Sequence, residues 1–232
     1  VRDWDQHTVV GTATQLEKKY FRLTGPANPA TIRPLHILRQ ALDHVVAKWE
    51  RERHYPYIRD QFKSLRQDLT VQRIQNEFTV QVYERHAWIA LESGDLGEFN
   101  LCFTKLKELY GLGINGHVNE FLGYYILYLI HVNKKSDMIS TITNLTPEQK
   151  ANPGVRHALD VRTAVTTLNY HRLFRLFTQA PNMNKLVMNH FITRQRVLAL
   201  IIIAQSYRSS VSVEFIAQEL ALGSQADALH FL

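Results

Sequence analysis

Residues 62–110 read FKSLRQDLTVQRIQNEFTVQVYERHAWIALESGDLGEFNLCFTKLKELY, and this stretch decides the fold class. On both sides of Ser93-Gly94-Asp95, apolar residues recur at intervals of three and four, which predicts two helices joined by a tight turn. Helices joined by so short a turn lie antiparallel and pack on each other. The spacing is not a strict repeat of about 34 residues, so the stretch predicts a tetratricopeptide-like (TPR-like) hairpin.

Length and composition set limits on the class of protein. The chain has 232 residues and is 45% hydrophobic, which suits one large domain, or one domain with a small module. A single cysteine, Cys102, excludes a disulfide or a cysteine-based zinc site within the chain and favours a reducing compartment. The apolar runs at residues 121–132 and 197–204 are shorter than the ~20 residues of a membrane span. We expect both runs to be buried helices and the protein to have no membrane partner.

The rest of the chain predicts more helices, so the fold class is all-α. Pro34 is expected in the first turn of one helix, Thr70 as an N-cap after a break at residues 68–70, Gly111 as a C-terminal cap, and Ser136 as another N-cap. Residues 1–10 read as irregular. The expected helical segments cover residues 14–23, 34–52, 56–67, 70–92, 95–110, 119–131, 136–142, 147–151, 153–165, 170–180 and 186–207.

Near Val211 the pattern changes to two short helices around Leu222-Gly223-Ser224, which is a helix-turn-helix signature. Behind a helical array, this signature predicts a winged helix whose strands would follow Leu232. The expected domains are a TPR-like, PCI-like array over residues 1–208 and the N-terminal part of a winged-helix module over residues 209–232. The start at Val1 without a methionine and the end on a helical pattern indicate a piece of a longer protein.

The chain carries no catalytic motif. It lacks G-x-x-x-x-G-K-[ST], G-x-G-x-x-G, G-x-S-x-G and H-E-x-x-H. His86 is expected to be a core or boundary histidine with satisfied hydrogen bonds. Asp60, Asp68 and Glu77 are expected to be exposed charges on a helix surface. We therefore predict no catalytic residue, no metal, no cofactor and no small-molecule substrate, and a protein that is not an enzyme.

Positive charge is concentrated between residues 156 and 208. This block holds eight cations against one acid, Asp160, while the whole chain has a net charge of +6. The block is either a solvated helix surface that happens to be basic or a surface that faces an anion. The candidate nucleic-acid-binding residues are Arg156, Arg162, Arg172, Arg175, Lys185, Arg194, Arg196 and Arg208.

Five segments carry a family resemblance, in chain order and over nearly the whole length. They resemble the Sac/GANP/Thp family of PCI-like proteins, and within it the Thp branch, which is similar to a vertebrate leukocyte-receptor-cluster member. The segments are LEKKYFRLT at 16–24, NPATIRPLHIL at 28–38, QFKSLRQDLTVQRIQNEFTVQVYERHA at 61–87, ALESGDLGEFNLC at 90–102 and NYHRLFRLF at 169–177.

The resemblance implies a TPR-like array capped by a winged helix. It implies pairing, winged helix beside winged helix, with a second PCI-fold subunit that holds a small acidic Sem-type protein. Such complexes act in the nucleus on messenger RNA, in transcription elongation, splicing or export, and offer a basic platform to RNA or single-stranded nucleic acid. The candidate partner-binding residues are Phe215, Glu219, Gln225 and His230.

Three hypotheses follow. The first is a non-enzymatic scaffold subunit of a nuclear mRNA complex that also binds nucleic acid. Because the expected recognition helix, SQADALHFL at residues 224–232, has no Lys or Arg, we expect contacts to the nucleic-acid backbone or to protein rather than to base edges. The second is a PCI subunit of a proteasome-lid-like assembly that binds only protein. The third, an RNA-processing enzyme, requires an acidic metal cluster that the sequence lacks.

Overall fold

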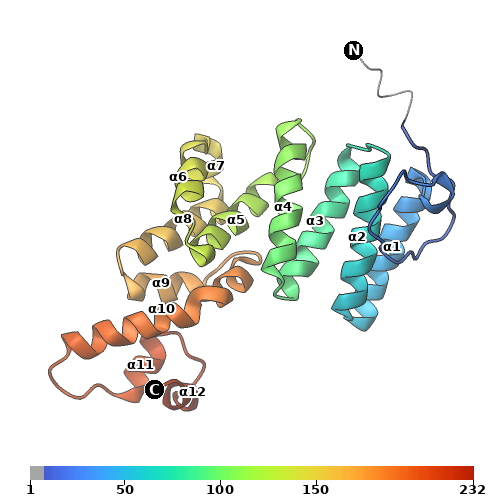
Figure 1. The fold of residues 1–232 in the computed structure, drawn as a ribbon. Coiled ribbons are helices and arrows are strands. Elements are labelled where there is room, and N and C mark those ends of the chain that lie inside the picture. The colour runs from blue at the N-terminus through green and yellow to red at the C-terminus, as the bar shows by residue number, and fades with distance from the viewer. Residues whose placement is uncertain (1–7) are drawn as a thin grey trace. The chain divides into compact units, whose positions relative to one another are not determined.

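The computed structural model of the protein describes residues 8–232, and these residues form an all-α fold of packed helices (Figure 1). The predicted all-α, PCI-like helical array is thus confirmed, and no strand occurs in residues 8–232. The chain divides into two compact units, Val1–Gly116 and His117–Leu232. The predicted irregular segment at residues 1–10 lies mostly outside the described residues. The predicted boundary between residues 208 and 209 separates the helical array from the winged-helix module, and it stays a prediction.

Within residues 8–116 the first unit contains four α-helices and one turn of 3-10 helix. Sequential helices pack on one another, α1 on α2, α2 on α3 and α3 on α4. The apolar stripes of α1, α2 and α3 meet in one buried cluster that includes Leu38, Trp49, Phe62 and Phe78, as the periodicity predicts. The elements are η2 (Pro29–Thr31), α1 (Leu35–Glu52), α2 (Tyr55–Val71), α3 (Glu77–Glu92) and α4 (Leu96–Gly111).

The predicted hairpin is formed by α3 and α4, which lie side by side (Figure 1). Gly94 adopts a φ of 73°, a conformation that glycine reaches without steric cost. The Asp95 side chain then accepts a hydrogen bond of 2.9 Å from the backbone N–H of Glu98 and caps α4. At the other end, α3 begins with a capping box between Asn76 and Thr79. Local sequence therefore fixes both the start of α3 and the turn into α4.

The predicted break at residues 68–70 is wrong, because α2 runs without interruption to Val71. Thr70 caps nothing: its hydroxyl donates to the carbonyl of Arg66 within its own helix, at 2.8 Å. Asp68 is buried, not exposed as predicted. A short polar residue breaks a helix when its side chain bonds to the local backbone, but the Asp68 carboxylate bonds instead to Arg33 and Lys18.

Three other predicted cap positions also shift. Pro34 is the N-cap of α1 rather than a residue of its first turn. Gly111 is the last helical residue of α4, and the positive φ of 78° belongs to Gly113. Ser136 lies inside α6, whose N-cap is Lys134. These differences of one or two residues are within the usual uncertainty of helix ends.

Residues 14–23 do not form the predicted helix. They belong to an irregular segment, residues 11–33, which we call the N-terminal strap. Backbone donors of the strap bond to side chains of α2: Lys18 N donates to Gln61 Oε1 at 2.9 Å, and Tyr20 N donates to Asp60 Oδ2 at 3.2 Å. Because α2 satisfies these donors, the strap does not need internal helical hydrogen bonds.

A buried ion pair anchors the strap. Arg33 and Asp68 are both fully buried, and Arg33 Nε donates to Asp68 Oδ2 at 2.7 Å. The other guanidinium nitrogens donate to Leu16 O at 2.9 Å and Ser64 Oγ at 2.8 Å. Lys18 Nζ bonds to the second Asp68 oxygen at 2.6 Å. The two buried charges are thus paired and hydrogen-bonded on all sides.

The second unit is built around α5, which packs against both α8 and α10. This agrees with the prediction that the apolar run at residues 121–132 forms a buried helix. A Cβ at Gly123 would lie 3.0 Å from the carbonyl oxygen of Gly154, so the glycine permits the close approach of α5 and α8. The elements are α5 (Val118–Val132), α6 (Lys135–Thr143), α7 (Pro147–Ala151), α8 (Pro153–Thr166), α9 (Tyr170–Thr178), α10 (Asn184–Ser206), α11 (Val213–Glu219) and α12 (Gln225–Phe231).

Asp68→Ala is expected to lower the free energy of unfolding by about 3–5 kcal/mol, because it leaves the Arg33 guanidinium buried without its counter-charge. The control is Glu108→Ala, which removes an exposed partner of Lys105 and should cost less than about 1 kcal/mol. Urea unfolding monitored by circular dichroism measures both. Equal losses in the two variants would contradict the role given to Asp68.

Candidate nucleic-acid and partner interface

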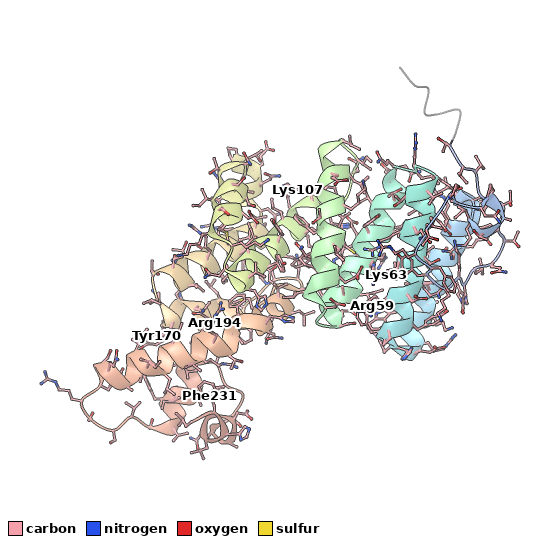
Figure 2. All side chains as sticks on the ribbon, in the orientation of Figure 1. Arg59, Lys63, Lys107, Tyr170, Arg194 and Phe231 are labelled. Atoms are coloured by element: carbon pink, nitrogen blue, oxygen red, sulfur yellow. The ribbon has the colours of Figure 1, made fainter. Side chains whose placement is uncertain are left out.

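The eight candidate nucleic-acid-binding residues all lie in the second unit, on or beside α8, α9 and α10. Five of them have exposed side chains that make no ion pair among the described residues. These five are Arg156, Arg175, Lys185, Arg194 and Arg208. Arg194 projects from α10 (Figure 2). The positive field of the block is therefore largely uncompensated by side chains of its own unit.

The other three cations have contacts within the unit. Arg172 Nη2 donates to Asp160 Oδ1 at 2.8 Å. Arg162 is half-buried and lines a groove that it shares with Arg194. Arg196 is half-buried, and burial lowers the pKa of its guanidinium. Arg172 and Arg196 therefore have fewer N–H donors left to bind a phosphate than the five exposed cations have.

Arg196 of α10 is hydrogen-bonded to the turn between α11 and α12. Its Nε donates to Leu220 O at 3.0 Å, and its Nη2 donates to Ala221 O at 2.8 Å. These two carbonyls follow α11, where the backbone of Ala221 turns with a φ of 50°. The guanidinium thus satisfies two acceptors that the end of the helix leaves open. No sequence pattern pairs Arg196 with this turn.

The four candidate partner-binding residues lie on α11 and α12. Phe215 packs edge-on against Tyr207, with ring centroids 5.7 Å apart, and Glu219 pairs with His171 at 2.9 Å. Gln225 and His230 are exposed on α12. The two helices and their turn have the predicted helix-turn-helix form, while the winged helix itself stays a prediction.

A surface that the sequence analysis missed lies along the second half of α10. Val197, Leu198 and Ile201 are 47%, 40% and 48% exposed, so the prediction that residues 197–204 form a buried helix is wrong in part. By length and composition alone α10 could cross a membrane, yet 39% of its most apolar window is buried in the fold. It packs on α5, α8 and α9 and leaves its other side open. An apolar run without clear periodicity does not tell which side is covered.

His86, Glu98 and Cys102 form a buried cluster in the first unit, with one ligand atom of each within 4.8 Å of the others. Their chemistry does not fit a cation. Arg66 donates to Glu98 Oε1 at 2.5 Å and to Cys102 Sγ at 3.0 Å. A positive charge therefore already occupies the carboxylate and the thiol that a metal would need as ligands. Burial also raises the pKa of Cys102 to about 12, which keeps the thiol protonated and a poor ligand.

The prediction that His86 is a satisfied histidine is wrong. It is fully buried, and neither ring nitrogen has a hydrogen-bond partner among the described residues. The ring stacks on Phe62, with centroids 4.8 Å apart. Burial, with the nearby charges of Arg66 and of Lys63 and Arg59 on α2 (Figure 2), lowers the pKa of His86 well below its usual value. The imidazole therefore acts as a neutral aromatic ring in the core.

Comparison with known proteins identifies the family to which this helical chain belongs. The model of the SAC3/GANP family matches residues 11–232, from the strap through α12. The chain belongs to the SAC3/GANP family. It is similar to the THP3 homolog of Schizosaccharomyces pombe, with 51% identity over 96% of this chain and 56% of that relative.

Two further relatives support the predicted Thp branch. The chain is 42% identical to the leukocyte receptor cluster member 8 homolog of Xenopus laevis, over 99% of this chain and 29% of that protein. It is 33% identical to protein THP3 of Saccharomyces cerevisiae, over 97% of this chain and 49% of that protein. This SAC3/GANP chain thus spans about half or less of the length of these relatives.

Arg196→Met is expected to loosen α11 and α12 while α8 and the first half of α10 keep their protection, because the turn after α11 loses two hydrogen bonds. Hydrogen exchange followed by mass spectrometry measures this, with Arg194→Met as the matched control on the same helix. Unchanged exchange in residues 213–231 of Arg196→Met would contradict the contact.

His86→Phe is expected to flatten the pH dependence of stability. The folded protein keeps His86 neutral, whereas the unfolded chain takes up a proton below a pKa of about 6.5, so stability present above that pH is lost as the pH falls. Between pH 7 and pH 5 this loss amounts to about 2 kcal/mol, and the variant should lack it. Urea unfolding at both pH values, with exposed His36→Gln as control, measures the difference; parallel curves for His86→Phe and the parent would contradict it.

Proposed function

We propose that this chain is a non-enzymatic scaffold subunit of a nuclear complex that acts on messenger RNA, in processing, transcription elongation or export. It pairs with a second PCI-fold subunit that carries a small acidic Sem-type protein, and it binds nucleic acid through its second unit. The observation that carries the proposal is the set of five exposed, unpaired cations inside the region that matches the family.

Phosphate binding suits these residues for a physical reason. A guanidinium or ammonium group without an ion pair in its own fold keeps donors for phosphate oxygens and displaces counterions from the nucleic acid when it binds. Of the five cations, Lys185 also lies over the Phe177 ring, 5.1 Å from its centroid. Helix α12 contains no Lys or Arg that could read base edges, and it carries Asp227 in its first turn. Binding should therefore be strongly salt-dependent and weakly selective for sequence, as expected for contacts to the backbone of single-stranded RNA.

The non-enzymatic part of the proposal draws on the buried His86 cluster. Within residues 8–232 these side chains are the group best placed to hold a metal, and Arg66 already occupies the carboxylate and the thiol. A scaffold role needs no such centre. Several exposed surfaces on one helical array are sufficient for it.

One observation favours a second candidate function, a protein-interaction subunit of a proteasome-lid-like PCI assembly that does not contact nucleic acid. The exposed apolar stripe of Val197, Leu198 and Ile201 on α10 suits a protein partner better than a phosphate backbone. In that case the arginines of the second unit would pair with acidic residues of the partner.

The triple variant Arg156→Gln, Arg175→Gln, Lys185→Gln is expected to bind single-stranded RNA at least about tenfold more weakly than the parent. The slope of log affinity against log salt should fall by about 2, because three phosphate contacts are lost at about 0.7 each. Fluorescence polarisation with a labelled poly-uridine oligomer, at several salt concentrations, measures both quantities in the complex with the partner subunit.

The matched control changes three exposed cations of the first unit, Lys19→Gln, Arg22→Gln and Lys107→Gln, and removes the same charge. It should keep the affinity and most of the salt slope. Equal effects of the two triple variants would show that only the net charge matters. RNA binding that neither variant alters would rule out the proposed surface and favour the protein-only function.

A further inference from the structure

A groove of about 500 Å³ opens in the second unit where the end of α5, the start of α6, α8 and α10 meet. Its floor is apolar and consists of Leu129, Ile130, Met138 and Val165. At its edge Ile139 is 62% exposed, which is unusual for so large an aliphatic side chain. A volume of this size is typical of a ligand pocket.

Four cations surround this apolar floor: Lys134, Lys135, Arg162 and Arg194. One acid compensates part of the charge, because Asp137 Oδ2 lies 3.8 Å from Lys134 Nζ. The other three cations make no ion pair among the described residues. The groove therefore combines an apolar floor, whose burial under apolar atoms would be favourable, with a cationic rim that attracts anions.

The start of α6 adds to the positive rim. Its N-cap, Lys134, makes no side-chain capping hydrogen bond. The first backbone N–H groups of α6 therefore lack the side-chain partner that Ser, Asp or Asn would supply at the N-cap. The positive end of the helix dipole lies beside two lysines and is offset in part by Asp137 in the first turn. A carboxylate that reached this point would meet backbone donors as well as ammonium groups.

The lining argues for one class of ligand. Proteins that hold single-stranded RNA stack its bases on aromatic side chains, and no aromatic residue lines this groove. A free anion would leave the apolar floor uncovered, and a neutral apolar molecule would make no use of the cations. A peptide with apolar side chains flanked by carboxylates matches both features.

We propose that the groove is a docking site for an acidic peptide segment of a partner protein, which places one or two apolar side chains on the floor and Asp or Glu beside the cationic rim. This site goes beyond the proposed function and does not depend on it. It uses none of the residues changed in the RNA experiment, Arg156, Arg175 and Lys185.

The test selects phage-displayed random dodecapeptides on the full chain and measures the best binders by fluorescence polarisation. We expect the selected peptides to carry Asp or Glu around Leu, Ile, Met or Phe. Ile139→Asp should weaken their binding at least about tenfold, and so should the double variant Arg162→Gln, Arg194→Gln. Ile139 is already exposed, so its replacement leaves the fold intact.

The controls use equivalent changes outside the groove. Ile201→Asp alters an exposed isoleucine of α10, and Arg175→Gln with Lys185→Gln removes two cations of the same unit. Both controls should retain peptide affinity within about twofold. Retention here, with loss in the groove variants, would support the site.

Three outcomes would overturn the proposal: selected peptides without an acidic excess, selected peptides whose binding the groove variants leave unchanged, or no enrichment at all. A fourth outcome is that Ile139→Asp and the arginine double variant weaken poly-uridine binding while no acidic peptide binds. The groove would then belong to the RNA surface, and the peptide proposal would be wrong.

Discussion

A buried charge is the constraint on which the first unit depends. Arg33 is one of the largest side chains in the protein with no exposed surface, and its guanidinium cannot lose its charge at any physiological pH. A bare guanidinium in the interior would cost more free energy than the fold has available. The fold therefore supplies Asp68, Ser64 and the carbonyl of Leu16 at hydrogen-bond distance, and three separate segments must meet there.

Gln72 extends this network to both ends of the strap. Its amide nitrogen donates to the carbonyls of Arg33 and Asp68, at 2.8 and 2.9 Å, and its oxygen accepts from Gly11 N at 3.0 Å. The strap is thus held to α2 at its start, middle and end. A hydrophobic cluster would have supplied similar burial, but it would not have required one register of the strap on the helix.

The same network explains where prediction from sequence succeeds and where it fails. The α3–α4 hairpin depends on neighbours in the chain, namely Asn76 with Thr79 and Gly94 with Asp95, so local patterns predict it. The strap and Asp68 depend on partners far away in sequence, and a short amphipathic or polar segment looks the same with or without them. The prediction for His86 fails for a related reason, because only the packing of the folded chain shows that its ring stacks on Phe62 without polar partners.

The candidate site shows the same limit. The sequence indicates that positive charge gathers between residues 156 and 208, and the structure adds which charges remain open. Arg172 and Arg196 have internal acceptors, while Arg175 and Lys185 have no ion pair in their unit. The exposed stripe of α10 could not be predicted, because residues 197–204 are apolar on all sides.

The two units treat their charges differently, and this difference gives them different capacities. In the first unit Lys18 and Arg33 pair with the buried Asp68, and Arg66 pairs with the buried Glu98, so these three cations stabilise the fold. In the second unit acids are scarce between residues 156 and 208, and the cations there stay available to a ligand. An unpaired exposed cation adds almost nothing to stability, whereas it attracts a negatively charged ligand. The hairpin that decides the fold and the surface proposed to bind nucleic acid are therefore different parts of the chain, because pairing that stabilises a charge internally also removes it from binding.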